Sequence, residues 1–259
     1  MKNVLTKNEK VIFFDLYQTL LDVKISSTDP IVKLKEELVG WESFVNKLKK
    51  YGVTIAANEF LKLYERRRDD FYSASRDKKI HHHNMQKIIA EVLEKDFSIQ
   101  RSSEELLNLV YVYRKAGRGW LRLYPGVFET LSTLSKEYTL STASHTQGSF
   151  TQLELRELDI EKFFSYFVYS SDIGLRKESP DFYKYALETT ERKVEDCVMV
   201  GDNYDVDVLV PQQLGMKTVW IKNPITSGRY AHLLKEKTEQ VNLEEFVTLP
   251  QVIDRVFKS

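Results

Sequence analysis

A short apolar run that ends in a single carboxylate constrains this chain more than any other stretch. Val11–Phe14 reads VIFF and is followed directly by Asp15. Four successive apolar residues fit a strand that is covered on both faces, as the strands of a parallel sheet are. Ligands of open α/β sheets lie beyond the carboxyl ends of the strands, so an active site is expected at Asp15. Taken alone, the stretch also fits a solvated Asp at the end of a helix or strand.

The block from residue 24 to residue 121 has helical rather than strand periodicity. Apolar residues at helical spacing predict helices over residues 31–48, 58–72, 83–93 and 106–113. Ser102 and Glu105 form a capping-box pattern ahead of the fourth helix. Four helices without a strand between them indicate a separate unit that is inserted after the first strand. We therefore predict a helical domain over residues 24–121 and a core built from residues 1–23 and 122–259.

Strand and helix patterns alternate after Tyr124-Pro125-Gly126. Strands are expected at residues 138–143, 166–170, 197–200 and 218–221, and helices at residues 127–134, 150–158, 181–188 and 206–214. This alternation is typical of βαβ units and a parallel sheet. The strand at Val11–Phe14 must join that sheet, because an isolated apolar strand is not stable. The expected fold is therefore α/β, a Rossmann-like parallel-sheet core with a mostly helical cap domain over the strand ends.

Composition narrows the range of partners. The 259 residues include 38 Lys plus Arg and 38 Asp plus Glu, a balance that gives no electrostatic reason to expect nucleic acid or membrane as partner. The single cysteine, Cys197, allows no internal disulfide, which fits a reducing compartment. The first residues are too polar for a signal peptide, and no apolar run is long enough to span a bilayer. We expect a cytoplasmic protein whose partner is a small molecule, and the sequence does not reveal its oligomeric state.

Polar side chains follow four of the expected strands. They are Asp15 and Tyr17, then Thr142 and Ser144, then Lys177, and finally Asp202 and Asp207. A parallel sheet brings such strand ends into one crevice, where clustered carboxylates repel one another and require a cation. Oxygen ligands that leave room for water favour Mg²⁺. An ammonium and a hydroxyl can bind an anionic substrate there, while one carboxylate attacks and takes a phosphoryl group.

These motifs, in this order, resemble those of the haloacid dehalogenase superfamily of Asp-nucleophile hydrolases. The first resembles DLYQT at residues 15–19, and the second a hydroxyl residue that closes the strand at residues 138–143. The third resembles GLRKESPDFY at residues 174–183, and the fourth GDNYDVD at residues 201–207. LYPGVFETL at residues 123–131 also resembles the segment that follows the helical cap in this family. The resemblance covers the whole core, and covers the cap by position and helicity only.

The resemblance implies a role for one residue of each of the first three motifs. Asp15 is implied to be the nucleophile, and Lys177 is implied to bind the transferring group. Ser144 shares that role, with Thr142 as the alternative hydroxyl. Thr142 is also a candidate for substrate binding.

The resemblance also implies the ligands of a Mg²⁺ ion. Asp202 and the carbonyl oxygen of Tyr17 are implied to bind the metal together with the nucleophile. Asp207 is implied either to bind it through water or to support the lysine of the third motif. Thr19 in the first motif and His145 in the loop after the second are candidates for substrate binding.

Tyr17 departs from the pattern of the family's phosphatases, which carry an Asp at this position as general acid. A phenol with a pKa of ~10 is a poor acid at pH 7, and loss of a general acid typically costs ~10²–10⁴ in rate. Substrates with good leaving groups, such as acyl or aryl phosphates, are therefore expected. Tyrosine here resembles the family's 2-haloacid dehalogenases, which need no metal.

The fourth motif favours the phosphatase interpretation. Asp202 and Tyr204 stand where the dehalogenases have small neutral residues, and the stretch 41–47 lacks the Arg that receives halide in those enzymes. We predict a Mg²⁺-dependent phosphatase for a small phosphorylated metabolite. A metal-free 2-haloacid dehalogenase-type hydrolase and a weakly active or non-catalytic binding protein are the alternatives.

Two further clusters have ordinary interpretations. His81-His82-His83 is interpreted as a solvated helix start rather than a transition-metal site, because adjacent histidines do not face one point on a helix. Arg66-Arg67-Arg68 is interpreted as a charged outer helix face that Asp69 and Asp70 balance.

Overall fold

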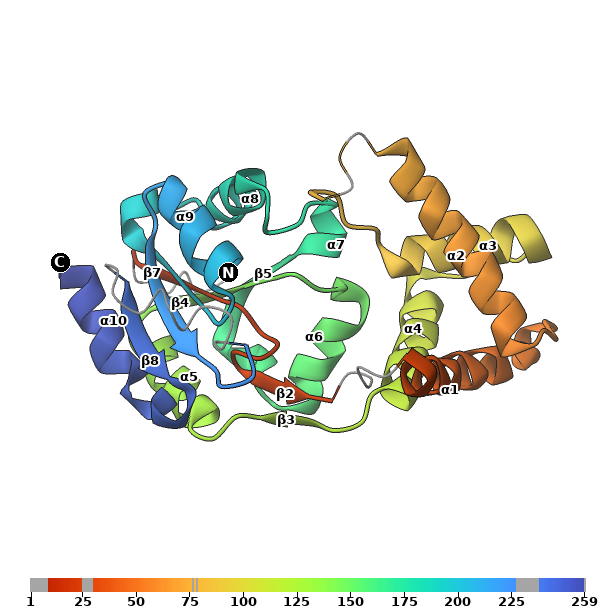
Figure 1. The fold of residues 1–259 in the computed structure, drawn as a ribbon, viewed down its shortest axis with the longest axis horizontal. Helices are drawn as coiled ribbons and strands as arrows, with labels where there is room; N and C mark the ends of the chain where they lie inside the picture. Colours follow the sequence, from red (N-terminus) through yellow and green to blue (C-terminus); the bar gives the residue numbers. More distant parts are fainter. Residues whose placement is uncertain (1–8, 25–29, 76, 78, 227–237, 259) are drawn as a thin grey trace, which may run out of the picture.

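A six-stranded parallel sheet lies at the centre of the larger part of the molecule (Figure 1). The computed structural model describes residues 9–24, 30–75, 77, 79–226 and 238–258, with the backbone alone for residues 30–37. The strand order is β5-β4-β1-β6-β7-β8, and every neighbouring pair is parallel. The strands are β1 (Val11–Phe14), β4 (Thr139–Ser144), β5 (Phe164–Tyr169), β6 (Cys197–Gly201), β7 (Lys217–Lys222) and β8 (Glu239–Asn242).

Helices cover both faces of the sheet, as the apolar run in β1 requires. Ile12 and Phe14 pack in one cluster with residues of α5, α6 and α10, whereas Val11 and Phe13 pack on the other face with residues of α8 and α9. These side chains are fully buried. The predicted Rossmann-like α/β core is therefore confirmed. The helices are α5 (Val127–Glu137), α6 (Gly148–Glu157), α7 (Ser170–Ile173), α8 (Pro180–Thr190), α9 (Val210–Gln213) and α10 (Leu249–Lys258).

Four helices form a second part of the molecule with a hydrophobic cluster of its own (Figure 1). The ring of Trp41 lies at its centre and contacts the rings of Phe44, Phe60, Tyr64 and Tyr113. A short antiparallel pair, β2 (Leu21–Val23) and β3 (Leu121–Leu123), lies in the chain segments on either side of this block. The helices are α1 (Pro30–Leu48), α2 (Ala57–Ala74), α3 (Met85–Phe97) and α4 (Ser103–Gly117).

The four cap helices lie where helical periodicity predicts them. Each is longer than predicted, by one residue for α1 and by seven for α4. The capping box ahead of α4 is present, with Ser102 Oγ accepting from the Glu105 backbone N–H at 3.2 Å. The division into a core and a helical cap at residues 24–121 stays a proposal. Its predicted border at residues 121/122 falls inside β3 and not between two elements. Among the described helices, none combines the length and the apolarity that crossing a bilayer would require.

Several elements differ from the prediction or were not predicted, and β2, β3 and α7 are among them. The strand expected at residues 166–170 begins at Phe164 and ends at Tyr169, and the next residue starts the short helix α7. The helix expected at residues 206–214 is a π-helical segment, Tyr204–Leu209, followed by α9, whose second residue is Pro211. β8 has the sequence EQVN and lies at the sheet edge, so it shows no apolar run by which it could be recognised.

Candidate active site

The loop after β1 places Asp15 at the carboxyl end of the central strand. The Asp15 backbone N–H donates to Val200 O of β6 at 2.9 Å, so the sheet ladder extends to this residue. The chain then turns sharply, since Leu16 O accepts from the N–H groups of Leu20 and Leu21 at 2.7 and 2.8 Å. Gln18 adopts a left-handed conformation with φ of 66° in this turn. The turn keeps the side chains of the first motif at the edge where the other strands end.

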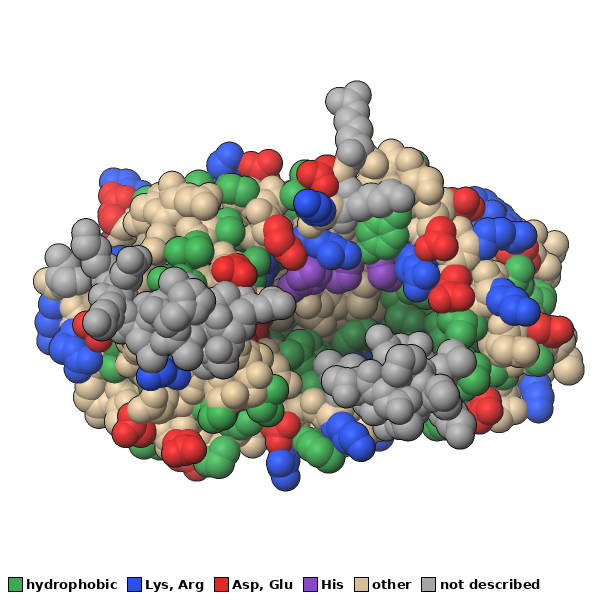
Figure 2. Space-filling model, in the orientation of Figure 1, with side chains coloured by type: hydrophobic (Ala, Val, Ile, Leu, Met, Phe, Trp, Pro, Cys, Tyr) green, Lys and Arg blue, Asp and Glu red, His purple; other side chains and the backbone are tan. Residues whose placement is uncertain are grey.

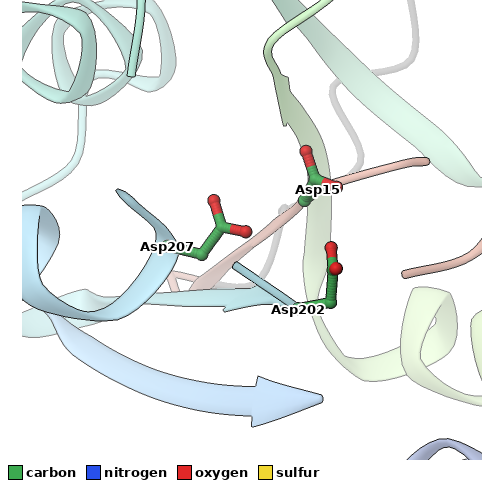
Figure 3. A group of neighbouring side chains, drawn as sticks. All are labelled: Asp15, Asp202 and Asp207. Atoms are coloured by element: carbon green, nitrogen blue, oxygen red, sulfur yellow. The ribbon is translucent and has the colours of Figure 1, made fainter. Parts of the chain in front are cut away.

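Three carboxylates converge at this edge (Figure 3). Asp15 follows β1, Asp202 follows β6, and Asp207 lies in the π-helical segment after it. One oxygen atom from each can be chosen so that all three lie within 4.8 Å of one another. All three residues are buried. The sequence prediction that these carboxylates share a site is met by this arrangement.

Among the residues that the structure describes, Lys177 supplies the one ammonium in direct contact with this group. Its Nζ lies 2.5 Å from Asp15 Oδ1 and 2.7 Å from Asp207 Oδ1, and the side chain is only 1% exposed. Burial alone would lower the pKa of Lys177, but the two carboxylates outweigh it and hold the pKa above its usual value. Lys177 is therefore charged and offsets part of the negative charge of the site.

One ammonium does not neutralise three buried carboxylates. Burial, followed by the charge of Asp15, raises the pKa of Asp202 to about 6. Burial likewise raises the pKa of Asp207 to about 7, although Lys177 acts in the opposite direction. A hard divalent cation would remove this repulsion, and a buried set of carboxylate oxygens suits Mg²⁺. The residues present therefore fit the metal that the first and fourth motifs imply.

Hydrogen bonds hold the two aspartates of the fourth motif, at the carboxylate of Asp207 and at the backbone carbonyl of Asp202. Asp207 Oδ2 accepts from the Asn203 N–H at 3.1 Å while its Oδ1 contacts Lys177, so both of its oxygens are engaged. This arrangement favours support of Lys177 over metal binding through water. Trp220 Nε1 donates to the carbonyl oxygen of Asp202 at 2.8 Å. Trp220 was not singled out in the sequence, because it lies on β7, outside the four motifs.

The hydroxyl candidates separate into two kinds. Ser144 Oγ donates to Asp15 Oδ1 at 3.1 Å and lines the pocket. Thr142 Oγ1 instead accepts from the Val168 N–H of β5 at 3.0 Å, and Thr142 does not line the pocket. Thr142 is thus bonded to the neighbouring strand and lies outside the pocket lining, so the geometry favours Ser144 over Thr142 as the hydroxyl that contacts a ligand.

Thr19 and His145 occupy different positions relative to the pocket. Thr19 is fully buried and its Oγ1 lies 3.0 Å from Asp202 Oδ1 and 3.3 Å from Asp15 Oδ2, so it bridges the two carboxylates beneath the pocket surface. His145 lines the pocket, with its Nδ1 3.8 Å from a carboxylate oxygen of Glu178. The pocket has a volume of about 260 Å³. It is lined by Asp15, Tyr17, Gln18, Ser144, His145, Lys177, Glu178, Asp202, Asn203, Val206, Asp207 and Thr226.

Histidine side chains lie along one edge of a hollow between the two parts of the molecule (Figure 2). The ring of His82, from the segment before α3, lies 4.8 Å from the ring of His145. His82 Nδ1 contacts Ser170 Oγ at 2.6 Å, and its Nε2 contacts Gln147 Nε2 at 3.1 Å. The two nitrogens of His83 contact the hydroxyls of Tyr64 and Tyr72, each at 2.9 Å.

The interpretation of His81-His82-His83 as a solvated helix start is therefore wrong. Burial lowers the pKa of His82 to about 3 and that of His83 to about 4, so both are neutral at pH 7. They connect the cap to two core loops, and helix α3 itself begins only at Met85. Arg66 and Arg67 also differ from the prediction, because they pair with Asp96 of α3 rather than with Asp69 or Asp70.

The titration of the buried carboxylates predicts a pH-dependent stabilisation by metal. The pKa values of Asp202 and Asp207 in the folded chain exceed the 3.8 of an ordinary Asp, so the metal-free folded state binds protons that the unfolded state has released. In metal-free protein the free energy of unfolding contributed by these groups falls as the pH rises from about 4 to about 7. Mg²⁺ bound among these carboxylates would compete with the protons, so the increase in unfolding free energy on adding Mg²⁺ should be about 2–4 kcal/mol larger at pH 8 than at pH 5.

Urea unfolding in Mg²⁺ and in EDTA at both pH values measures this difference. Protonation of the buried neutral histidines lowers the free energy of unfolding as the pH falls, which is the opposite direction. This contribution is the same with and without metal. The difference between the two series therefore isolates the carboxylates. An equal effect of Mg²⁺ at pH 5 and pH 8 would contradict the proposed metal site.

Comparison with known proteins places the chain in one family. A family model described as haloacid dehalogenase-like hydrolase matches residues 12–221. A glyceraldehyde 3-phosphate phosphatase from Pyrococcus furiosus is 28% identical over 253 residues, covering 95% of this chain and 93% of that protein. Pyrophosphatase PpaX from Bacillus mycoides is 28% identical over 113 residues, covering 43% of this chain and 52% of that protein. The crystal structure of a 2-haloacid dehalogenase from Pseudomonas syringae superposes with a TM-score of 0.60 at 20% identity, covering 95% of this chain and 98% of the other, and shares the fold.

Proposed function

This chain belongs to the haloacid dehalogenase-like hydrolase family, and on that premise we propose that it is a Mg²⁺-dependent phosphatase for a small phosphorylated metabolite. The observation that carries the proposal is the contact of both Lys177 Nζ and Ser144 Oγ with one oxygen of Asp15 inside the pocket. An ammonium and a hydroxyl beside a buried carboxylate suit binding of a phosphoryl group at the point of attack. The phosphatases among the relatives support this class of substrate.

The proposed reaction has two steps at Asp15. A carboxylate oxygen attacks phosphorus, an O–P bond forms, and the bond to the leaving group breaks with its electron pair. Water then hydrolyses the aspartyl phosphate, which releases inorganic phosphate and restores the carboxylate. Lys177 and Ser144 hold the phosphoryl oxygens and offset the charge that develops on them. Mg²⁺ bound to Asp15, Asp202 and the carbonyl oxygen of Tyr17 would supply further charge stabilisation.

Neither of two candidate proton donors at the pocket is suited to act as a general acid. Burial raises the pKa of the Tyr17 hydroxyl well above its usual value, and that hydroxyl already donates to Glu154. Burial lowers the pKa of His145, although Glu178 acts in the opposite direction, so the imidazole is neutral at pH 7. The leaving group would therefore depart without a proton from either side chain. We propose acyl, aryl or diphosphate substrates, in which the leaving group is a stable anion.

Hydrolysis of p-nitrophenyl phosphate tests the proposed function directly. We expect turnover in Mg²⁺ and its loss in excess EDTA, with recovery when Mg²⁺ is added back. Turnover that persists in EDTA would contradict the metal-dependent mechanism. Acetyl phosphate and glycerol phosphate, assayed in parallel, compare a good leaving group with a poor one.

Restoring a carboxylate at position 17 should change the selectivity between these substrates. In Tyr17→Asp, the ratio of kcat for glycerol phosphate to kcat for p-nitrophenyl phosphate should rise about 10- to 100-fold, because only the alkoxide needs a proton. The ratio cancels any loss that affects both substrates. An unchanged ratio would mean that the proton comes from elsewhere or is not required.

One observation favours a second candidate function, that of a 2-haloacid dehalogenase. A tyrosine at position 17 resembles the first motif of those enzymes. Chloride release from 2-chloropropionate without metal would support that activity. The three buried carboxylates argue against it, because they require a cation that dehalogenation does not. A non-catalytic binding protein would instead bind Mg²⁺ without turning over any of the phosphate esters.

A further inference from the structure

The hydroxyl of Tyr17 is hydrogen-bonded to side chains of helix α6. It donates to Glu154 Oε2 at 2.5 Å and lies 3.0 Å from Thr151 Oγ1. Glu154 is fully buried, and no part of its carboxylate reaches solvent. The residue at the usual position of the general acid therefore points its only polar atom into the protein interior.

Glu154 is shared with the last helix of the cap. Arg114 on α4 donates to Glu154 from Nε at 2.8 Å and from Nη2 at 3.4 Å. Arg118, directly after α4, donates to the same carboxylate at 2.9 Å. Both arginine side chains are buried, with 10% and 4% exposure. We call these four residues, Tyr17, Glu154, Arg114 and Arg118, the buried bridge.

Ring contacts join the same segments as the hydrogen bonds do. The guanidinium of Arg114 lies 5.6 Å from the centre of the Tyr17 ring and 4.5 Å from that of Phe150 on α6. Tyr17 packs against the hydrophobic cluster of the sheet and also against that of the cap, and Phe150 belongs to the cap cluster. Tyr17 is therefore in contact with both parts of the molecule, two residues after Asp15.

We propose that Tyr17 is a positioning residue that couples cap helix α4 to the loop carrying Asp15, an inference that rests on the proposed phosphatase function. A movement of α4 displaces Arg114, and separating a buried carboxylate from its partner is costly. Glu154 and the Tyr17 hydroxyl bonded to it are therefore drawn along with the helix. Because only two residues separate Tyr17 from Asp15, the position of the cap sets the alignment of the attacking carboxylate.

Tyr17→Phe tests the proposal while leaving Glu154 paired with both arginines. We expect kcat to fall about 10- to 100-fold, the scale of a misaligned reacting group, with little change in KM. The fall should be the same for p-nitrophenyl phosphate and glycerol phosphate. A fall confined to glycerol phosphate would identify Tyr17 as the acid, and an unchanged kcat would show that its hydroxyl positions nothing. Either result would overturn the proposal.

Tyr111→Phe is the matched control. Tyr111 on α4 donates to Glu157 on α6, so it makes the same Tyr-to-Glu bond to the same helix α6, but from α4 and at the exposed side. Tyr111→Phe should leave kcat unchanged. A loss as large as that of Tyr17→Phe would mean that any weakening of the α4–α6 contact lowers activity, which would contradict a specific role for Tyr17.

A double-mutant cycle with Arg114→Lys tests the coupling itself. Arg114→Lys keeps the charge but loses the two-pronged contact, so alone it should lower kcat. In the double variant, kcat should be little lower than in Tyr17→Phe alone, because the hydrogen bond between Tyr17 and Glu154 is already absent. Independent, multiplying effects would contradict coupling.

Amide hydrogen exchange of residues 15–21 provides a readout that does not depend on turnover. Exchange in this loop should rise in Arg114→Lys relative to the wild-type chain, and not in Tyr111→Phe. Unchanged exchange in Arg114→Lys would overturn the coupling even if the enzyme were active. Faster exchange in a chain without phosphatase activity would instead show that the proposed function fails while the coupling holds.

Discussion

Asp15→Asn is expected to abolish phosphatase activity, with kcat reduced on the order of 10⁶-fold, the scale seen when the nucleophile of a covalent mechanism is removed. Asparagine keeps the shape of the side chain but cannot form the acyl phosphate. Folding should be preserved, because Lys177 retains Asp207 as partner at 2.7 Å. Hydrolysis of p-nitrophenyl phosphate and the circular dichroism unfolding midpoint measure the two effects.

Asp181→Asn is the control for this experiment. Asp181 is an exposed residue of α8 that pairs with Lys184 at the surface. The substitution makes the same chemical change away from the pocket and should leave kcat unaltered. Substantial activity in Asp15→Asn would show that another group attacks phosphorus.

Lys177→Met is expected to lower both stability and activity. The substitution leaves Asp15 and Asp207 buried without the ammonium that separates them. Removing one partner of a buried ion pair typically costs about 3–5 kcal/mol, and we expect a loss of this size in urea unfolding in EDTA. Mg²⁺ should restore part of the stability, because it can neutralise the carboxylates, but it should not restore kcat.

The surface pair on α8 again supplies the control. Lys184→Met removes a lysine whose side chain is 57% exposed, and should cost less than about 1 kcal/mol. The loss of unfolding free energy in Lys177→Met should also be smaller at pH 5 than at pH 8. At pH 5 Asp207, whose pKa is about 7, is protonated and needs no ammonium beside it. Losses of equal size in the two lysine variants would contradict the described ion-pair cluster.

The sheet and the convergence of the motifs could be predicted from local patterns. The apolar runs of β1 and β6 are each followed directly by functional residues, and parallel strands bring their carboxyl ends together. The cap helices were predictable because a single apolar face repeats along each of them. β8 was not, because an edge strand with one buried apolar residue, Val241, has no distinctive pattern.

Features that depend on contacts between distant segments were not predictable. The buried bridge joins Tyr17, Glu154, Arg114 and Arg118, yet these residues come from three separate segments of the chain and no local pattern marks them as partners. The sequence identified Tyr17 as a departure from the phosphatase motif, but could not say where its hydroxyl points. His82 resembled a solvated helix start for the same reason, since its ring contacts Ser170 and Gln147, which lie far along the chain. The ring of His83 instead contacts Tyr64 and Tyr72 of α2.

Chemical trapping of the phosphorylated enzyme tests the central claim most directly. The chain would be mixed with Mg²⁺ and acetyl phosphate, quenched in acid during turnover, digested and examined by mass spectrometry. We predict that one phosphoryl group is found on Asp15 and is absent from Asp15→Asn treated in the same way. Phosphate attached to a different residue, or rapid turnover in Mg²⁺ with none attached at any time point, would contradict nucleophilic attack by Asp15.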